Sequence, residues 1–247
     1  MIIFMRIDKL LCELNLGSRS QVKELIKKGF VYVDDRVLKK PETHVDEKTV
    51  TITCQGKTYR YAPYVYYMMN KPSGVITATQ DEKEQTVLDV LRTELLKSGS
   101  LAGIPFKDIS PVGRLDKDTT GLLLLTNNGT LSHSLLSPKN HVPKKYFVKT
   151  DGPISQEMVQ ALEEGVMIGR EEKTLPAKIE ERNSNECLIT ITEGKYHQVK
   201  RMFHAVGREV IYLKRLAMGA LTLDARLCEG QIRELTKEEV HELCLKI

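Results

Sequence analysis

The polar stretch 111–121 brings together residue types that could do chemistry. It reads Pro-Val-Gly-Arg-Leu-Asp-Lys-Asp-Thr-Thr-Gly, so Asp116 and Asp118 stand among an arginine and a lysine. The run 122–126, Leu-Leu-Leu-Leu-Thr, follows at once and predicts a buried strand. Loops fixed on a rigid strand often carry nucleophiles and acid–base groups. The same residues also fit a salt-bridged turn or an Asx-turn that starts the strand, so residue types alone leave catalysis undecided.

Histidines and cysteines do not favour a metal centre. His197 and His204 are two helical turns apart, and no H-E-x-x-H frame is present. No C-x-x-C pair occurs among the five cysteines, which are Cys12, Cys54, Cys187, Cys228 and Cys244. We expect separate thiols in a reducing cytoplasm, and no metal.

The elements that must position the polar loop are mixed helices and strands. We expect strands at 64–69, 122–126, 145–150, 187–192, 210–215 and 221–223. We expect helices beginning at 86, 130, 156 and 197, and a last one opened by the capping box of Thr236 and Glu239. No regular βαβ rhythm is present, which predicts an α+β fold with a largely antiparallel central sheet flanked by helices.

The excess positive charge lies in the first quarter of the chain. Residues 1–63 hold 12 Lys and Arg against 8 Asp and Glu, whereas residues 64–247 hold 25 of each kind. Such asymmetry indicates an anionic partner, most commonly nucleic acid. The candidate RNA contacts lie on the polar faces of two expected helices, where a merely solvated face is the alternative: Arg6, Lys9, Arg19, Lys23, Lys27 and Lys28.

Those two helices open the chain. Apolar residues at 7, 10, 11 and 14 form one helical stripe, and Ser18 with Gln21 forms a capping box that opens a second helix. Short strands are expected at 30–33, 36–38, 49–53 and 57–61. The segment MRIDKLLCELNLGSRSQVKELIKKGFVYVDDRVLKKP resembles the S4-type RNA-binding domain, although Asp35 stands where that family often has glycine.

Pro63 marks the expected boundary between two domains. Residues 1–63 form the small S4-like α/β domain, with residues 1–4 an extension if Met5 is the natural start. Residues 64–247 form the second domain.

The second domain resembles the pseudouridine synthases of the ribosomal small-subunit type. GRLDKDTTGLLLLTNNG is similar to the catalytic motif of that family, which implies Asp116 as the nucleophile and leaves Asp118 to hold the loop. PKKYFV is similar to the strand whose tyrosine packs against the target base, here Tyr146. EGKYHQVKRMFHAVG resembles the motif whose basic residue pairs with the aspartate, so Lys200 takes that role, with Arg201 the alternative.

The resemblance also implies flanking substrate contacts at Arg114, Leu115, Lys145 and Leu216. Leu216 stands in LKRLAMGALTLD, where it would pack under the uracil. Ordinary core packing is the alternative for Leu216, as a half-buried strand position is for Tyr146. In the implied reaction the aspartate attacks C1′ or C6, or abstracts a proton at C2′, with its charge stabilised by the neighbouring cation. No cofactor is required.

These motifs predict an enzyme that isomerises one uridine of ribosomal RNA, either free or in a small-subunit assembly intermediate. The small-subunit type implies uridine 516 of 16S rRNA as the target. Three alternatives remain: a sister enzyme for 23S rRNA, a non-catalytic RNA-binding or assembly protein, and a metal-dependent hydrolase that uses both aspartates. We expect a cytoplasmic monomer without a secretory signal, and the short apolar runs exclude a membrane span.

Overall fold

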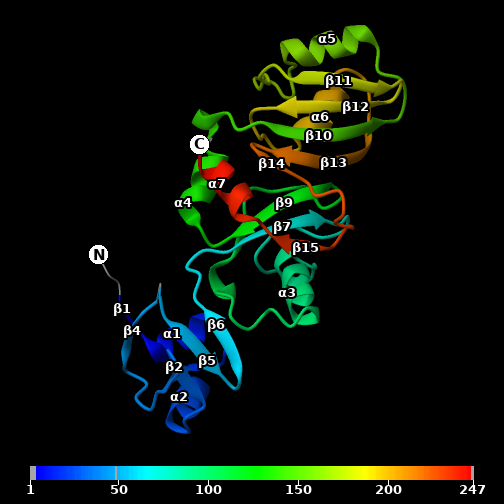
Figure 1. Cartoon of the computed structure of the whole chain (residues 1–247). Coiled ribbons are helices and arrows are strands. Elements are labelled where there is room, and N and C mark those ends of the chain that lie inside the picture. The colour runs from blue at the N-terminus through cyan, green and yellow to red at the C-terminus, as the bar shows by residue number, and fades with distance from the viewer. Residues whose placement is uncertain (1–3, 48, 246–247) are drawn as a thin grey trace. The chain divides into compact units, whose positions relative to one another are not determined.

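The computed structural model describes residues 4–47 and 49–245 (Figure 1). Contacts divide the chain into two compact units, one of Met1–Val65 with Leu91–Ile109 and one of Tyr66–Val90 with Ser110–Ile247. The possible extension at residues 1–4 lies outside the described residues except for Phe4, which begins strand β1.

The first unit packs helices α1 (Ile7–Glu13) and α2 (Arg19–Lys27) against short strands. Four strands form a sheet in the order β3-β2-β5-β6, and β1 pairs with β4 separately. Their bounds are β1 Phe4–Arg6, β2 Val31–Val33, β3 Arg36–Val37, β4 His44–Asp46, β5 Thr51–Cys54 and β6 Lys57–Arg60. The apolar stripe of α1 is fully buried, and the predicted capping box of Ser18 and Gln21 is present at the start of α2.

The turn between β2 and β3 shows how Asp35 replaces a glycine. Asp34 and Asp35 both adopt positive φ, at 45° and 64°. Aspartate tolerates this left-handed region better than most residues. The Asp34 carboxylate also accepts a hydrogen bond from the Thr51 backbone at 2.9 Å, which ties the turn to β5.

The second unit is built on one large sheet with the order β11-β12-β10-β13-β9-β7-β15. Every pair in this path is antiparallel except β13 with β9, which confirms the α+β fold with a mostly antiparallel sheet. Two short strands flank it, β8 beside β9 and β14 beside β13. The bounds are β7 Tyr66–Lys71, β8 Ser110–Pro111, β9 Thr120–Thr126, β10 Lys144–Thr150, β11 Lys178–Asn183, β12 Glu186–Ile191, β13 Val210–Met218, β14 Leu221–Thr222 and β15 Ile232–Glu234.

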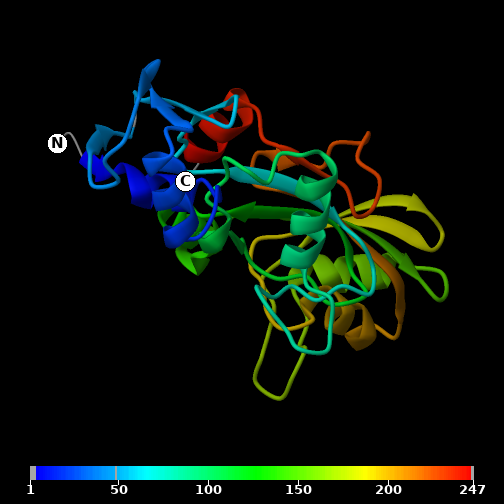
Figure 2. The same cartoon turned by 90° about the horizontal axis from the view of Figure 1, so that it is seen from below.

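Helices cover this sheet. Their bounds are α4 Gly129–Leu136, α5 Gln156–Glu164, α6 Gln198–Ala205 and α7 Lys237–Leu245. A further helix, α3 (Val87–Lys97), begins one residue after the expected start at 86, and its residues are divided between the two units at Leu91. Figure 2 shows α5 and α6, in yellow-green and gold, on the same face of the sheet. The Thr236–Glu239 capping box forms as predicted, through hydrogen bonds of 2.8 and 3.2 Å.

Gly121 allows the parallel junction between β9 and β13. It pairs with Arg215, and a Cβ at this position would lie only 2.2 Å from the Arg215 carbonyl oxygen. Its φ of +101° also disfavours any residue with a side chain. The glycine that ends the polar loop is therefore required where the two halves of the sheet meet.

Candidate active site

The loop that carries Asp116 is fixed from beneath by a buried lysine. Lys71, at the end of β7, is fully buried. Its Nζ donates three hydrogen bonds, at 2.9, 3.1 and 3.0 Å, to the carbonyl oxygens of Pro72, Lys117 and Thr119. On the other side, the Thr77 hydroxyl donates to the Leu115 carbonyl at 2.7 Å and accepts from the Leu115 N–H at 3.1 Å. The backbone is thus held before and after Asp116.

Two basic side chains meet the Asp116 carboxylate from the α6 side. Lys200 Nζ lies 3.5 Å from Asp116 Oδ2, and His197 Nε2 lies 3.4 Å from Oδ1. Lys200 also donates a shorter hydrogen bond of 2.6 Å to Asp118 Oδ1. This bond lowers the pKa of Asp118 below its usual value, against a smaller opposing effect of burial. Lys200 therefore bridges two carboxylates, with Asp118 holding it beside Asp116.

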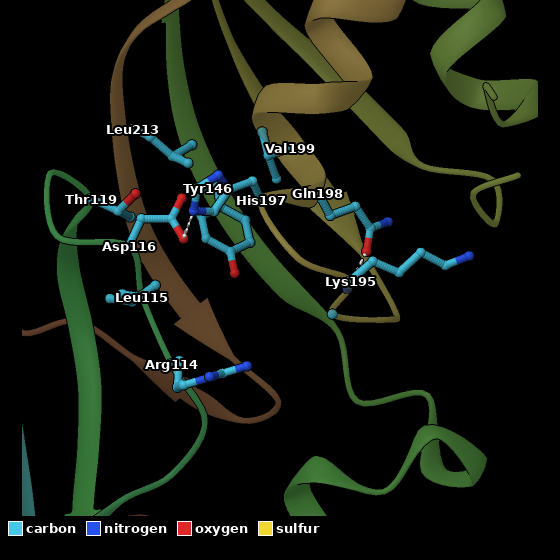
Figure 3. Close-up of a pocket in the computed structure, with 11 residues that line it drawn as sticks. Arg114, Leu115, Asp116, Thr119, Tyr146, Lys195, His197, Gln198, Val199 and Leu213 are labelled. Atoms are coloured by element: carbon cyan, nitrogen blue, oxygen red, sulfur yellow. Dashed lines mark hydrogen bonds and ion pairs between the residues drawn. The ribbon is translucent and has the colours of Figure 1, made fainter. Parts of the chain in front are cut away.

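Tyr146 lies across a pocket from Asp116 (Figure 3). It belongs to β10, is 8% exposed, and pairs with Ile189 of β12 and Arg215 of β13. Arg114 and Leu115 line the same pocket, so the structure brings these predicted residues together with Asp116 and Tyr146. A pocket with an aromatic ring on one wall and a carboxylate on another can hold a flat heterocycle against the ring while the carboxylate reacts.

Two predicted contacts do not reach this pocket. Lys145 forms an ion pair of 3.0 Å with Glu180, because adjacent side chains of a strand point to opposite faces and Tyr146 occupies the pocket face. Leu216 is the extra residue of a β-bulge, since Lys145 pairs with Ala217 and Tyr146 already pairs with Arg215. Leu213 of the same strand lines the pocket instead. The pocket beside Asp116 is therefore lined by neither Lys145 nor Leu216.

Arg201 faces away from Asp116. Its guanidinium donates to the carbonyl oxygen of Ile168 and pairs with Glu172 at 2.7 Å. A further hydrogen bond of 3.0 Å goes to the Tyr196 carbonyl. Since neighbouring residues on a helix point in different directions, only one of Lys200 and Arg201 can face the loop, and it is Lys200.

His197 also contacts Asp116, a role that the sequence did not predict. It precedes α6 in the left-handed region, at φ 47°, and its ring stacks on Tyr196 with centroids 3.9 Å apart. A non-glycine residue in this region marks a constrained backbone, which often accompanies a functional site. Its position three residues before Lys200 was the available signal.

The six cations expected to contact RNA all lie in the first unit, in two groups. Three of them form ion pairs: Arg6 with Asp8 at 2.8 Å, Lys9 with Glu13 at 3.6 Å, and Lys28 with Glu24 at 2.6 Å. The remaining three, Arg19, Lys23 and Lys27, are exposed on α2. The exposed side of α2 is therefore the most available cationic surface among these residues.

The buried Lys71 predicts a pH limit on activity. Desolvation lowers the pKa of Lys71 to about 8, although the charges of Asp118 and Asp116 oppose the effect. Below that pH the ammonium has three protons for three carbonyl oxygens, and above it the amine has two. We expect kcat to fall as pH rises through about 8, measured from pH 6.5 to 9.5. Lys71→Met should have lower activity, and its kcat should not fall as pH rises through this range. If the kcat of the variant falls in the same way, a group other than Lys71 is responsible.

The described residues contain neither a cluster of metal-ligand side chains nor a membrane-spanning helix. No three His, Cys, Asp or Glu side chains gather as a possible metal site within 4–47 and 49–245. Within the same residues, no helix combines the length and the apolar character that a bilayer span requires.

Comparisons with known proteins agree on one family. The RNA pseudouridylate synthase model matches residues 65–205, and the S4 domain model matches residues 5–50. The chain is 49% identical to an uncharacterized RNA pseudouridine synthase of Bacillus subtilis, over 97% of this chain and 98% of the relative. It is 41% identical to the ribosomal small subunit pseudouridine synthase A of Vibrio cholerae, over 96% and 98%. A crystal structure of a pseudouridylate synthase matches with a TM-score of 0.66 and 33% identity, covering 97% and 99% of the two chains.

Proposed function

Because this chain belongs to the RNA pseudouridylate synthase family, we propose that it isomerises a uridine of ribosomal RNA, with Asp116 as the nucleophile. The observation that carries the proposal is the Asp116 carboxylate in a pocket opposite Tyr146, with Lys200 at 3.5 Å. These residues come from separate motifs and meet only through the fold. A domain that had lost catalysis would have no need to hold them together.

The chemistry explains each residue type. Pseudouridine forms when the N1–C1′ bond breaks, the uracil turns, and a C5–C1′ bond forms. The C5 proton is released and N1 takes up a proton, so the product is an isomer of uridine. Asp116 must be ionised to attack the nucleotide, and Lys200 and His197 supply stabilising donors. Every bond change involves only the protein and the RNA, so the proposal includes no cofactor.

The uridine must leave its base stack before it can enter the pocket. Extruding a base costs a few kcal/mol, and least where it lies in a loop or bulge. Stacking on the Tyr146 ring offsets part of that cost, because every base has a π-face. A structured RNA loop is therefore the substrate that this pocket favours.

We assign the target to uridine 516 of 16S rRNA, in the free RNA or in a small-subunit assembly intermediate, with the protein acting in the cytoplasm as a monomer. The Vibrio cholerae relative named for the ribosomal small subunit supports this choice, since it matches nearly the full length of both chains. A target in 23S rRNA is the competing outcome.

We assign RNA anchoring to the S4-like domain of residues 1–63. Changing Lys23, Lys27 and Lys28 together to Glu should weaken binding of 16S rRNA at least about tenfold and make log K less dependent on log[salt], because fewer counterions are released. Filter binding at several KCl concentrations measures both effects. The matched control changes Lys149, Lys178 and Lys237 of the second unit to Glu, which alters net charge equally. Unchanged binding in the first variant would make residues 1–63 a spacer.

Tritium release tests the activity itself. Transcripts of 16S and 23S rRNA are made with [5-³H]uridine, since forming the C5–C1′ bond displaces the tritium into water. We expect release of one equivalent of tritium per 16S transcript. Treating enzyme and RNA with a chelator of transition metals should not change this release. No release from any transcript or assembly particle that the protein binds would favour the non-catalytic alternative. Release that stops with the chelator would overturn the cofactor-free mechanism.

A further inference from the structure

A second pocket adjoins the first in the catalytic unit. It has a volume of about 360 Å³ and shares Arg114, Tyr146, Gly194 and Lys195 with the pocket of Asp116. Its own wall includes two more cations, Lys144 of β10 and Arg215 of β13. A nucleotide whose base lies on Tyr146 would therefore have this cationic pocket beside it.

Arg215 is buried with hydrogen-bonding capacity to spare. Arg215 is only 3% exposed, and its Nε donates a hydrogen bond to the Leu122 carbonyl at 2.7 Å. Its Nη2 is inaccessible to solvent and has no hydrogen-bond partner among the described residues. A buried guanidinium N–H without an acceptor raises the free energy of the folded protein. An anion that accepts a hydrogen bond from it removes this cost, so binding is more favourable than at an exposed arginine.

Lys144 strengthens the case from the neighbouring strand. Burial and the nearby Arg215 charge both lower its pKa, in that order. Two like charges held close together on adjacent strands favour an anion between them. Glu193, the carboxylate among the described residues of this pocket, is engaged by Lys195 at 3.5 Å and by the Gln198 amide at 2.7 Å. Its charge raises the pKa of Lys144, but by less than burial and Arg215 lower it.

Part of the remaining wall is apolar. Leu136, Pro138 and Met218 line it, so a bound anion would be partly shielded from water. Charge interactions are stronger in such an environment than at an open surface. Surface lysines that merely attract RNA have no comparable enclosure.

We propose that this second pocket binds a backbone phosphate adjacent to the target uridine, with Arg215 and Lys144 as its ligands and Arg114 at its rim. This inference rests on the proposed function. The phosphate contact fixes the position of the RNA strand along the site. The target base, and not the base next to it, then enters beside Asp116 and Tyr146. Arg215, Lys144 and Arg114 are thus positioning residues for the reaction.

A substrate series with single neutral linkages tests the proposal. Each short RNA of the series contains the target uridine and one methylphosphonate, placed in turn at each linkage around that uridine. We expect one linkage at which the wild-type kcat/KM falls about tenfold, the loss typical of one charge-assisted hydrogen bond. Lys144→Gln should show a similar loss with unmodified RNA and no further loss at that linkage.

The control is Lys145→Gln, one residue along the same strand and on the opposite face. It should keep the wild-type kcat/KM within about twofold and remain sensitive to the neutral linkage. Arg114→Gln, at the exposed rim, gives a second variant that does not disturb the core. Equal sensitivity of wild type and Lys144→Gln at every linkage would overturn the phosphate pocket. Turnover of unmodified RNA by the wild type would leave the proposed function standing in that case.

Discussion

Replacing Asp116 with Asn should lower kcat about a thousandfold or more while RNA affinity stays the same or increases slightly. The amide keeps the size of the carboxylate but cannot act as a nucleophile. Binding should persist because Tyr146 and the RNA-contacting cations are untouched, and one negative charge near the phosphates is removed. Steady-state tritium release at saturating RNA measures kcat, and filter binding measures affinity.

The matched control is Asp118→Asn, two residues along the same loop. Asp118 holds Lys200 at 2.6 Å, so its amide variant should lose about tenfold in kcat through a less fixed Lys200. Thermal unfolding of both variants checks that the loop still folds. A larger loss at Asp118 than at Asp116 would transfer the nucleophile to Asp118.

Replacing Lys200 with Met should lower kcat about a hundredfold, the typical cost of removing one preorganised charged donor. Among the described residues, His197 is then the basic side chain left in salt-bridge range of the Asp116 carboxylate. Single-turnover tritium release at saturating enzyme separates this effect from weaker RNA binding. Lys200→Arg should recover part of the rate because it restores a cation.

The neighbouring Arg201 supplies the comparison. Arg201→Met removes the ion pair with Glu172 and the hydrogen bonds to Ile168, and these contacts hold the segment before β11. We therefore expect lower thermal stability, with a much smaller loss in kcat than for Lys200→Met. If Arg201→Met loses as much kcat as Lys200→Met while remaining folded, the ion-pair assignment is wrong.

The sequence predicted the elements whose signals are local. The capping boxes at Ser18 and Thr236 depend on residues three positions apart, and both helices begin there. In contrast, β11 reads Lys-Ile-Glu-Glu-Arg-Asn and has little strand character of its own. It is a strand because it pairs with β12, and that long-range contact has no local signature.

The site was less predictable than its motifs. The sequence favoured Lys200 for the ion pair and left Arg201 as the alternative, and the directions of the two side chains on α6 distinguish them. The family resemblance pointed to Leu216, but the bulge in β13 could not be read from the sequence, and Leu213 lines the pocket. The pairing of Arg215 beside Tyr146, and hence the second pocket, depends on the same register.

Primer extension tests the central claim most directly. Transcripts of 16S and 23S rRNA and partly assembled particles are incubated with wild-type protein or Asp116→Asn, then treated with carbodiimide, which marks pseudouridine as a stop. We predict one new stop in 16S rRNA, at uridine 516, that is absent with the variant. A stop only in 23S rRNA would contradict the proposed target, and no stop on any bound substrate would contradict the proposed enzyme.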